Sequence, residues 1–394
     1  MGAMTKKLPI LIAGGGIGGL ATALALARRD LSSHVLEQAP AFGEVGAGIQ
    51  LGPNVFKLLE FLGIREAIDR VAFFPDKLVM RDSISGEELA HIPVASNAFR
   101  ERFNYPYGVI YRPDLMNVLI EACKKSALIQ LSNNQKIIDF SDDGDSVSVT
   151  TSVGSSHRGC VLIGADGLWS TIREKIVGDG APRVSGHIAY RAVLPMSEIP
   201  ASLRSNSMVL WAGPKRHFVH YPLRGGELFN MVAIFHSGRY SEGWDVYGEP
   251  EELMQRYDSA IAQVKTLLGR INTWKMWVLC DREPVKNWSK GRVTLLGDAA
   301  HPMLQYLAQG GCMAIEDAAV LTRQISIHGD EHAAALLAYQ NERYLRTARV
   351  QLTARFYGEI YHAESVKAEV RNQMFQANPP SMEGLAWLYD GIKE

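Results

Sequence analysis

Three groups of residues have the types and spacing that chemistry on a bound cofactor requires, and the first lies near the start of the chain. Gly14, Gly16 and Gly19 have G-x-G-x-x-G spacing, and Glu37 follows the next apolar pair. In this pattern the first glycine allows a tight turn, the second lets a pyrophosphate approach the backbone, and the third lets a helix pack on a strand. The helix N-terminus would face the phosphates, and Glu37 is placed to accept a ribose hydroxyl. A dinucleotide site is therefore predicted.

The second group is Gly164-Ala165-Asp166-Gly167 with Ser170 and Arg173, and the third is Gly297-Asp298-Ala299-Ala300-His301-Pro302. Each follows an apolar run typical of a buried strand. Ligands of open α/β sheets bind outside the carboxyl ends of the strands, so the three groups are predicted to share one site. The residues alone leave alternatives open. Asp166 also suits a helix N-cap, and Arg112 and Arg173 also suit surface ion pairs.

A further candidate is the segment from Lys215 to Pro222. Side chains alternate along a strand, so His217, Val219 and Tyr221 would share one face, and Phe218 and His220 the other. A histidine and a tyrosine on one face suit a pocket for a phenolic acid. The histidine could take the phenol proton, because its ordinary pKa of about 6.5 is near working pH. The alternative is a half-exposed strand whose His and Tyr face solvent.

The elements that must position these residues form two kinds of pattern. Strand–helix alternation appears at both ends and in the middle of the chain, whereas patterns typical of antiparallel strands fill residues 73–105 and 186–284. This predicts an α/β fold in which a nucleotide domain (4–72, 106–185 and 285–330) is interrupted by a sheet-rich domain (73–105 and 186–284). Residues 331–394 form a C-terminal helical region.

Several expectations concern individual segments. Helices are predicted over 112–124, 250–268, 313–325 and 331–365, the last with possible breaks, and Ser85-Gly86 is the predicted tip of a hairpin. The glycine-spaced stretch from Gly43 to Ile49 suggests backbone close to a ligand, or else a flexible surface loop. Arg343, Arg346 and Arg349 have helical spacing and are expected to form a solvated or dimer-contacting face.

Composition excludes several classes of protein. The 394 residues are 47% hydrophobic and carry a net charge of −1, which gives no electrostatic case for nucleic acid or an anionic membrane surface. No apolar run approaches the length of a membrane span. The four cysteines are far apart and the histidines show no H-E-x-x-H spacing, so a cytoplasmic protein without a metal site is expected.

The motifs D-G-x-x-S-x-x-R and G-D-A-A-H-P, at this distance from the N-terminal G-x-G-x-x-G, carry a family resemblance over essentially the whole chain. The chain resembles the single-component, FAD-dependent aromatic hydroxylases of the para-hydroxybenzoate hydroxylase group. The resemblance implies a Rossmann-like FAD domain of the glutathione-reductase type with a substrate-binding sheet domain. It also implies tightly held, non-covalent FAD, NADH or NADPH as a transient co-substrate, O2, and a homodimer as the family expectation.

The resemblance also assigns roles. It implies that Gly14, Gly16 and Gly19 hold the FAD pyrophosphate and that Glu37 holds the adenosine ribose. Arg112 would lie beside the phosphates and ribityl chain, and Asp298 would bind the ribityl hydroxyls. Asp166 would serve the FAD and, through its loop, the NAD(P)H side, where Tyr190-Arg191 also matches. The flavin would contact the loop that contains Gln309, Gly310 and Gly311, whose N–H groups can stabilise charge on reduced flavin.

On the substrate side, Gln305 stands where this family usually has a second proline. Glutamine both donates and accepts hydrogen bonds, whereas a proline carbonyl accepts. His217, Tyr221 and Gln305 together resemble the 3-hydroxybenzoate 6-hydroxylase branch, and Tyr107 and Asp76 are further candidates for the pocket. The resemblance implies hydroxylation through a C4a-hydroperoxyflavin, most simply of 3-hydroxybenzoate to 2,5-dihydroxybenzoate (gentisate) with NADH. His217 would be the base, helped by Gln305, and Tyr221 would anchor the acid.

Two alternatives remain at this stage. One is a salicylate 1-hydroxylase-like enzyme, which would release catechol by decarboxylating hydroxylation. The other is a flavin-fold binding protein without redox turnover, similar to the GDP-dissociation inhibitors. The intact D-G-x-x-S-x-x-R stretch argues against the second alternative.

Overall fold

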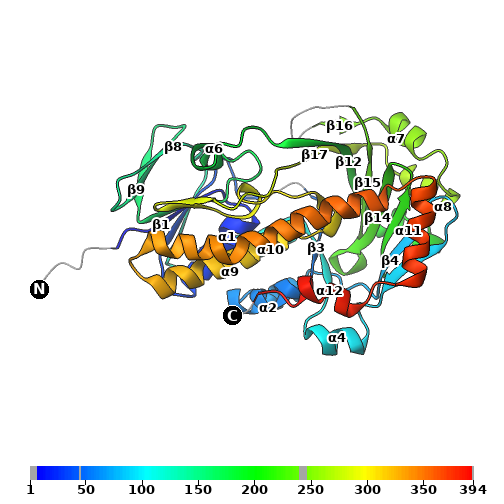
Figure 1. Cartoon of the computed structure of the whole chain (residues 1–394), viewed down its shortest axis with the longest axis horizontal. Helices are drawn as coiled ribbons and strands as arrows, with labels where there is room; N and C mark the ends of the chain where they lie inside the picture. Colours follow the sequence, from blue (N-terminus) through cyan, green and yellow to red (C-terminus); the bar gives the residue numbers. More distant parts are fainter. Residues whose placement is uncertain (1–6, 44–45, 239–245, 393–394) are drawn as a thin grey trace, which may run out of the picture.

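The computed structural model describes residues 7–43, 46–238 and 246–392 (Figure 1). Residues 4–6 of the first proposed domain, and Glu44 and Val45 of the glycine-spaced stretch, lie outside these ranges. Two large sheets dominate the described part, and helices pack on them. As predicted, the fold is α/β, with a parallel sheet and C-terminal helices. The domain boundaries stay a proposal.

A six-stranded sheet carries the three motifs. Its order is β18-β19-β11-β1-β2-β7, and all pairs are parallel except β18 with β19. The strands are β1 (Ile10–Ala13), β2 (Ser33–Leu36), β7 (Ile129–Ser132), β11 (Val161–Gly164), β18 (Ser289–Lys290) and β19 (Val293–Leu295). Because β1, β11 and β19 are parallel neighbours, their carboxyl ends deliver Gly14, Asp166 and Asp298 to one edge.

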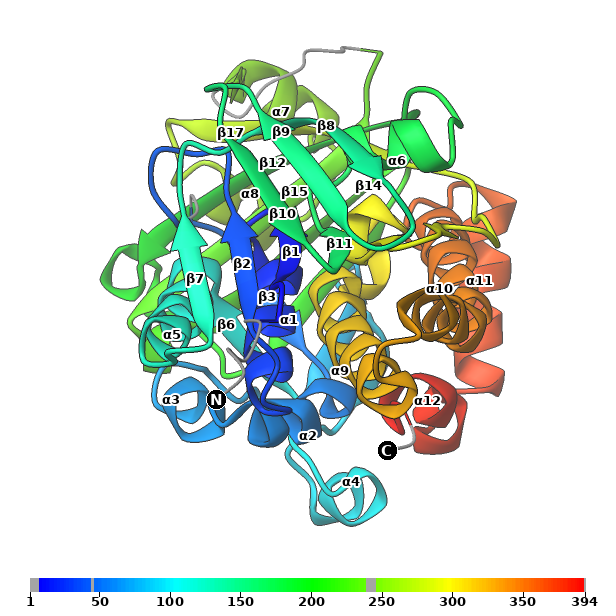
Figure 2. The same cartoon turned by 90° about the vertical axis from the view of Figure 1, so that its left-hand side faces the viewer.

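Helices pack on this sheet, and α1 and α6 follow its strands β1 and β11. Helix α1 starts directly after the glycine turn and is buried along almost its whole length, where it packs against α9 (Figure 2). The helices of this part are α1 (Ile17–Ala27), α2 (Pro53–Leu62), α3 (Arg65–Asp69), α5 (Arg112–Lys124), α6 (Thr171–Ile176) and α9 (Gly310–His328). The predicted helix 112–124 is confirmed, whereas α9 begins three residues before the predicted start.

The second large sheet has eight strands in the order β16-β17-β12-β15-β14-β13-β4-β5. Its strands are β4 (Leu78–Asp82), β5 (Glu88–Ile92), β12 (Arg183–Pro195), β13 (Met208–Gly213), β14 (Arg216–Leu223), β15 (Leu228–His236), β16 (Tyr247–Gly248) and β17 (Trp274–Asp281). The pairs are antiparallel apart from β13 with β4. A separate apolar core, which includes Phe218, Phe229 and Trp274, lies between this sheet and helices α7 (Pro250–Arg256) and α8 (Ala262–Leu268).

Smaller elements complete the described chain. They are a three-stranded sheet of β8 (Ile137–Asp142), β9 (Val147–Thr151) and β10 (Ser156–Gly159), the pair β3 (Gly48–Leu51) and β6 (Gly108–Tyr111), and helix α4 (Asn97–Phe103). Short 3-10 turns occur at 196–198, 201–203, 224–226, 297–299 and 305–307. The predicted hairpin tip at Ser85-Gly86 is confirmed between β4 and β5. The predicted helix 250–268 is instead two helices.

The C-terminal part contains α10 (His332–Tyr361), α11 (Val366–Ala377) and α12 (Met382–Tyr389). Helix α10 runs the length of the molecule, from α9 to the eight-stranded sheet (Figure 1). The expectation of a solvated arginine face on this helix is wrong for two of its three members. Arg343 is fully buried and pairs with Glu316 at 2.7 Å and Asp317 at 2.6 Å, and Arg346 pairs with Glu316 at 2.6 Å.

Candidate active site

In the glycine turn, two glycines are required by close packing and the third leaves room for a ligand. Gly14 has φ +102°, and a Cβ there would clash with the backbone of Ala165; a Cβ on Gly19 would clash with the carbonyl of Gly14. A Cβ on Gly16, in contrast, would meet nothing within 4 Å. The turn is thus closed on the protein side by Gly14 and Gly19 and open at Gly16, where the N-terminus of α1 begins.

The carboxylate of Glu37 lies against this turn. Its Oε2 accepts the N–H of Gly15 at 2.6 Å and its Oε1 accepts the N–H of Ala39 at 2.8 Å. Each carboxylate oxygen has a further lone pair. Two backbone donors therefore fix Glu37 at the end of β2, with capacity left for the hydroxyls of a ribose.

A series of hydrogen bonds connects the residues of the second motif to the loop of the third motif. Asp166 accepts the hydroxyl of Ser170 at 2.5 Å, and Ser170 caps α6 by accepting the N–H of Arg173 at 2.9 Å. The buried guanidinium of Arg173 donates to the carbonyls of Ala299 and Ala300 at 2.9 and 2.6 Å. It also pairs with Asp179 at 2.6 Å. Arg173 is therefore not a surface ion-pair residue, since it holds the loop that carries Asp298.

Asp298 is exposed, although the residues on either side of it are buried. Protein surrounds its carboxylate sufficiently that desolvation raises its pKa, while His301 and Arg112 act in the opposite direction. Beneath it, His301 Nε2 lies 2.5 Å from Asp317, which also accepts the N–H of Gly297 at 3.0 Å. These hydrogen bonds fix the loop on its buried side, and the exposed carboxylate of Asp298 is left as an acceptor for a ligand.

The start of α9 lies beside Asp298. A Cβ on Gly310 would lie 3.8 Å from Asp298 Oδ1, and one on Gly311 would lie 3.7 Å from Ile17 of α1. The first N–H groups of a helix have no partner within the helix. Gln309 is buried, and its side chain accepts from Asn54 at 3.2 Å. Arg112, at the start of α5, has its pKa lowered by burial, which Asp298 partly offsets.

These residues fit an FAD. Gly16 is open to a pyrophosphate, Glu37 is fixed for a ribose, Asp298 offers an acceptor to hydroxyls, and α9 offers N–H donors at the flavin end. The structure thus brings all ten predicted cofactor residues to one edge of the six-stranded sheet and its helix starts. Their assigned roles stay proposals. The desolvated carboxylate of Asp166 has a raised pKa.

On the substrate side, strand β14 is buried along its whole length, so the alternative of a half-exposed strand is wrong. His217 is buried; its Nδ1 lies 2.7 Å from Nε2 of His362, and burial lowers its pKa to about 3. His220 faces the other core, where its Nε2 accepts the indole N–H of Trp211 at 3.0 Å. The predicted alternation along this strand is confirmed.

Tyr221 and Tyr107 come together around Gln50. The Tyr107 hydroxyl donates to Gln50, and the Tyr221 ring lies against Gly48, two residues before Gln50. The structure does not bring Asp76 to this group. Asp76 is exposed before β4, where its N–H donates to the carbonyl of Asn206 at 2.8 Å. Strand β13 separates β4 from β14 in the sheet, so the geometry gives this prediction no support.

Arg191 is a buried charge that contacts Gln305. The family resemblance assigns it to the NAD(P)H side only and does not include it among the substrate residues. Its guanidinium donates to Gln305 and lies over the ring of Trp277 at 5.2 Å. Burial, followed by the charge of Arg112, lowers its pKa to about 10, so it stays protonated at neutral pH. Arg191 Nε and Gln305 Nε2 are buried without a hydrogen-bond partner. The position of Arg191 in the sequence does not reveal that its charge lies in the interior of the protein.

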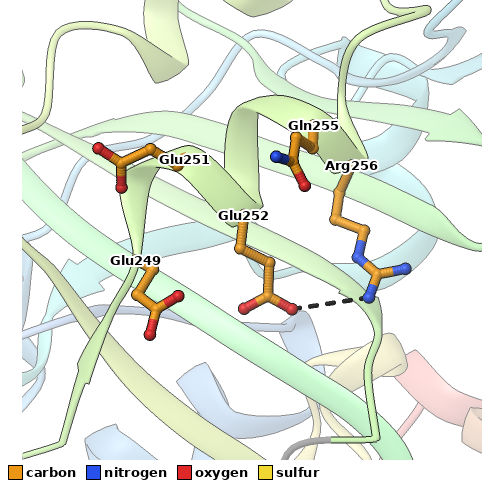
Figure 3. A pocket seen from close by; sticks show the side chains of 5 residues that line it. All are labelled: Glu249, Glu251, Glu252, Gln255 and Arg256. Atoms are coloured by element: carbon orange, nitrogen blue, oxygen red, sulfur yellow. Dashed lines mark ion pairs between the residues drawn. The ribbon is translucent and has the colours of Figure 1, made fainter.

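A hollow elsewhere on the surface is unrelated to these residues. Figure 3 shows it over α7, lined by Glu249, Glu251, Glu252, Gln255 and Arg256. Glu252 pairs with Arg256 at 3.6 Å and accepts the hydroxyl of Tyr190 at 3.1 Å. None of the predicted cofactor or substrate residues lines it.

With this geometry in view, residues 7–354 match the family described as an FAD binding domain. The chain belongs to this FAD-binding family. It is 46% identical to 3-hydroxybenzoate 6-hydroxylase of Polaromonas naphthalenivorans (strain CJ2) over 97% of this chain and 96% of that protein. It is 36% identical to 6-hydroxynicotinate 3-monooxygenase of Bordetella bronchiseptica (strain ATCC BAA-588 / NCTC 13252 / RB50) over 88% and 91% of the two chains.

Solved structures of the family show the same architecture. Klebsiella pneumoniae HpxO complexed with FAD and uric acid superposes with a TM-score of 0.84 at 25% identity and covers 94% of this chain and 93% of its own. A salicylate hydroxylase substrate complex has a TM-score of 0.82 at 23% identity, covers 98% and 96% of the two chains, and supports the fold alone. The predicted resemblance to FAD-dependent aromatic hydroxylases is confirmed, and FAD is the cofactor.

Proposed function

We propose that this protein is an NADH-dependent flavin monooxygenase that converts 3-hydroxybenzoate and O2 to 2,5-dihydroxybenzoate. The observation that carries the proposal is the near full-length similarity to proteins named 3-hydroxybenzoate 6-hydroxylase, at 46% identity. The arrangement of His217, Gln305, Arg191 and Tyr221 next to the flavin end of the site supports it. Bound FAD supplies the chemistry that activates O2 and transfers one oxygen atom to the ring.

The phenol end of the substrate is assigned to His217. Its Nδ1 is engaged by His362, so Nε2 is the nitrogen left for the phenol. Burial lowers the pKa of His217 to about 3, well below the ordinary value, so the ring is neutral and accepts the phenol O–H as a hydrogen bond while the proton leaves. Loss of that proton makes the ring electron-rich at the position para to the oxygen, which is the position hydroxylated in 2,5-dihydroxybenzoate. Gln305 both donates and accepts, so it can hold the phenol oxygen in either state.

The carboxylate end is assigned to Tyr221 and Arg191. His217 and Tyr221 are four positions apart on one face of β14, which separates their Cα atoms by about 13 Å. One aromatic ring with a hydrogen bond at either end spans such a distance. Arg191 adds a charge that stays positive at neutral pH, and a buried charge of this kind is stabilised by an anionic partner.

The eight-stranded sheet is proposed to cover the reaction. The face of this sheet that carries His217 also buries Val219 and Tyr221, and Tyr306 packs against His217 with ring centres 5.4 Å apart. Aromatic and apolar walls exclude water from the reacting atoms. The proposed substrate domain, 73–105 and 186–284, contains the strands of this sheet except for the first three residues of β12.

The proposal extends to assembly and location. Leu345, Leu352 and Phe356 are 52–66% exposed and lie at helical spacing along α10, which supports a homodimer. Light scattering on the purified protein should then give twice the chain mass of 43.5 kDa, and the monomer mass would contradict it. None of the described helices has the length and apolarity to span a membrane, and we propose a cytoplasmic protein.

The function is tested by NADH and NADPH oxidation with the purified, FAD-loaded protein and a panel of hydroxybenzoates. We expect 3-hydroxybenzoate to stimulate NADH oxidation most strongly, with dihydroxybenzoate formed in near-equal amount. Catechol from salicylate, without turnover of 3-hydroxybenzoate, would instead support a decarboxylating hydroxylase. A colourless protein that ignores NADH would support a binding protein without redox turnover.

A further inference from the structure

Three histidines from distant segments meet at one point of the eight-stranded sheet. His187 of β12 and His236 of β15 are cross-strand partners, and His362 follows the last residue of α10. One ring nitrogen of each lies within 4.8 Å of the others. The sequence predicted no metal site because these residues share no local spacing, whereas the fold places them together.

The ring geometry suits coordination of a single ion. The ring centres are 4.2 Å apart for His187 and His236, 4.9 Å for His187 and His362, and 5.0 Å for His236 and His362. Imidazoles that bind one ion at 2.0–2.1 Å in adjacent coordination positions have ring centres roughly 4.5–5 Å apart. The observed triangle needs small ring rotations to reach that arrangement.

The nitrogen atoms that point away from this centre already have partners. His187 Nδ1 lies 2.5 Å from the hydroxyl of Tyr306, and His362 Nε2 lies 2.7 Å from His217 Nδ1. This leaves His187 Nε2 and the pair His362 Nδ1 and His236 Nε2 for the centre. The last two atoms lie 3.0 Å apart in a hydrogen bond that a bound ion would replace. Outer-shell hydrogen bonds of this kind orient histidine ligands in metal sites.

The ligand set selects the class of ion. Three imidazoles without carboxylate or thiolate suit zinc, copper or nickel rather than calcium or magnesium. Among the charged groups near His236, Glu359 and Glu364 favour a cation, and Lys215 and Arg256 oppose one. Lys215 pairs with Glu364 at 3.2 Å, so these two charges largely cancel. His187 and His236 are half-buried, which leaves the centre accessible to an ion.

We propose that His187, His236 and His362 form a binding site for one divalent transition-metal ion of the zinc type. The site lies on the far side of His217 from the reacting phenol. An ion there would keep water or a small anion in its remaining coordination positions.

Binding at this site would act on His217, a consequence that rests on the proposed function. An ion on Nδ1 of neutral His362 leaves the proton of that ring on Nε2, which must then donate to His217 Nδ1. The proton of His217 then lies on its Nε2, the nitrogen assigned to the phenol. In this tautomer His217 donates and does not accept, so the ion would inhibit hydroxylation.

The site is tested on the FAD-loaded protein after chelation and removal of the chelator. Zn²⁺ is added, free ion is removed, and bound zinc is measured by mass spectrometry; Co²⁺ reports coordination by its visible absorption. His236→Ala removes one ligand without contacting His217, and His91→Ala, an exposed residue of β5, is the matched control. We expect one ion per chain in wild type and His91→Ala and none in His236→Ala. Equal binding in His236→Ala, or no binding in wild type, would overturn the site.

The effect on catalysis is measured separately with 3-hydroxybenzoate. We expect stoichiometric Zn²⁺ to lower product formation at least tenfold in wild type and His91→Ala and to leave His236→Ala unchanged. Binding without inhibition would overturn the link to His217 while supporting the site. Absence of turnover before zinc is added would count against the proposed function, and the binding measurement would still decide the site.

Discussion

At the scale of single residues, some polar side chains of the site are fixed by hydrogen bonds within the protein, and others keep a polar atom without a hydrogen-bond partner. Glu37, Asp166 and Arg173 are held by hydrogen bonds in the protein itself. Arg191 Nε and Gln305 Nε2 are buried without partners. Buried polar atoms normally have partners, and two unpaired atoms on side chains that contact each other support a place for a ligand here.

Replacing His217 should uncouple the enzyme. In His217→Asn the phenol loses its proton acceptor, so we expect product formation to fall about 100-fold. NADH oxidation should continue with release of hydrogen peroxide. His220→Asn is the matched control, because His220 is a buried histidine on the same strand that faces the other core. Product and peroxide are quantified per NADH, and wild-type coupling in His217→Asn would refute the assignment.

Replacing Arg191 should weaken binding of the acid. A charge-assisted hydrogen bond contributes about 1.5–3 kcal/mol, so Arg191→Met should raise the KM for the hydroxybenzoate roughly 10- to 150-fold. Arg191→Lys keeps the charge without the planar fork and should fall in between. Steady-state kinetics and the flavin content of each variant are measured together. An unchanged KM with full flavin content would show that Arg191 does not bind the carboxylate.

At the scale of elements, three parallel strand ends position the cofactor site and the second motif supports the third. The sequence could predict these loops because glycine spacing, apolar strands and helix starts are local signals. It could not predict Arg191 or the place of Asp76, since both depend on which strands become neighbours in the eight-stranded sheet. The solvated face expected for Arg343 failed for the same reason, because its partners lie on α9.

The glycine turn gives a test that separates cofactor binding from folding. Gly16→Val adds a side chain in open space at an extended backbone, so the protein should fold but purify without FAD. Gly19→Val should instead destabilise the fold, because its Cβ would meet the Gly14 carbonyl. Circular dichroism and flavin absorbance are compared for both variants. Full flavin content in Gly16→Val would contradict the pyrophosphate assignment.

The ion pairs between α9 and α10 are expected to stabilise the fold strongly. Arg343→Met leaves the buried carboxylates of Glu316 and Asp317 short of a positive partner, which costs about 3–5 kcal/mol. Lys124→Met, which removes an exposed pair with Glu121, should leave the stability almost unchanged, because solvent screens such pairs. Urea unfolding at neutral pH measures both. A similar loss in the two variants would show that the buried pairs contribute little.

The same ion pairs determine how the stability of the fold changes as the pH falls. Burial opposes ionisation of Asp317, yet His301 and Arg343 hold its pKa below the usual range. A carboxylate with a lowered folded pKa contributes stability above its unfolded pKa and loses it as the pH falls towards the folded value. The fold should therefore weaken below about pH 4, and this acid dependence should be smaller in Arg343→Met.

At the scale of the whole molecule, the two large sheets have different proposed functions. In the proposed function, the six-stranded sheet and the start of α9 hold the FAD, and the eight-stranded sheet presents His217, Tyr221 and Arg191 to the substrate. The glycine cluster organises the first sheet but carries no information about the substrate. We propose that the choice of substrate depends on contacts between strands β12 and β14 and the loop at Gln305, which form only in the folded chain.

The central claim is most directly tested by the product formed from 3-hydroxybenzoate with NADH and ¹⁸O-labelled O2. The purified protein is incubated with both, and the products are separated and identified by mass and by comparison with standards. We predict 2,5-dihydroxybenzoate that carries a single ¹⁸O atom. Unlabelled product, another dihydroxybenzoate isomer, or NADH oxidation that yields only hydrogen peroxide would contradict the proposed function.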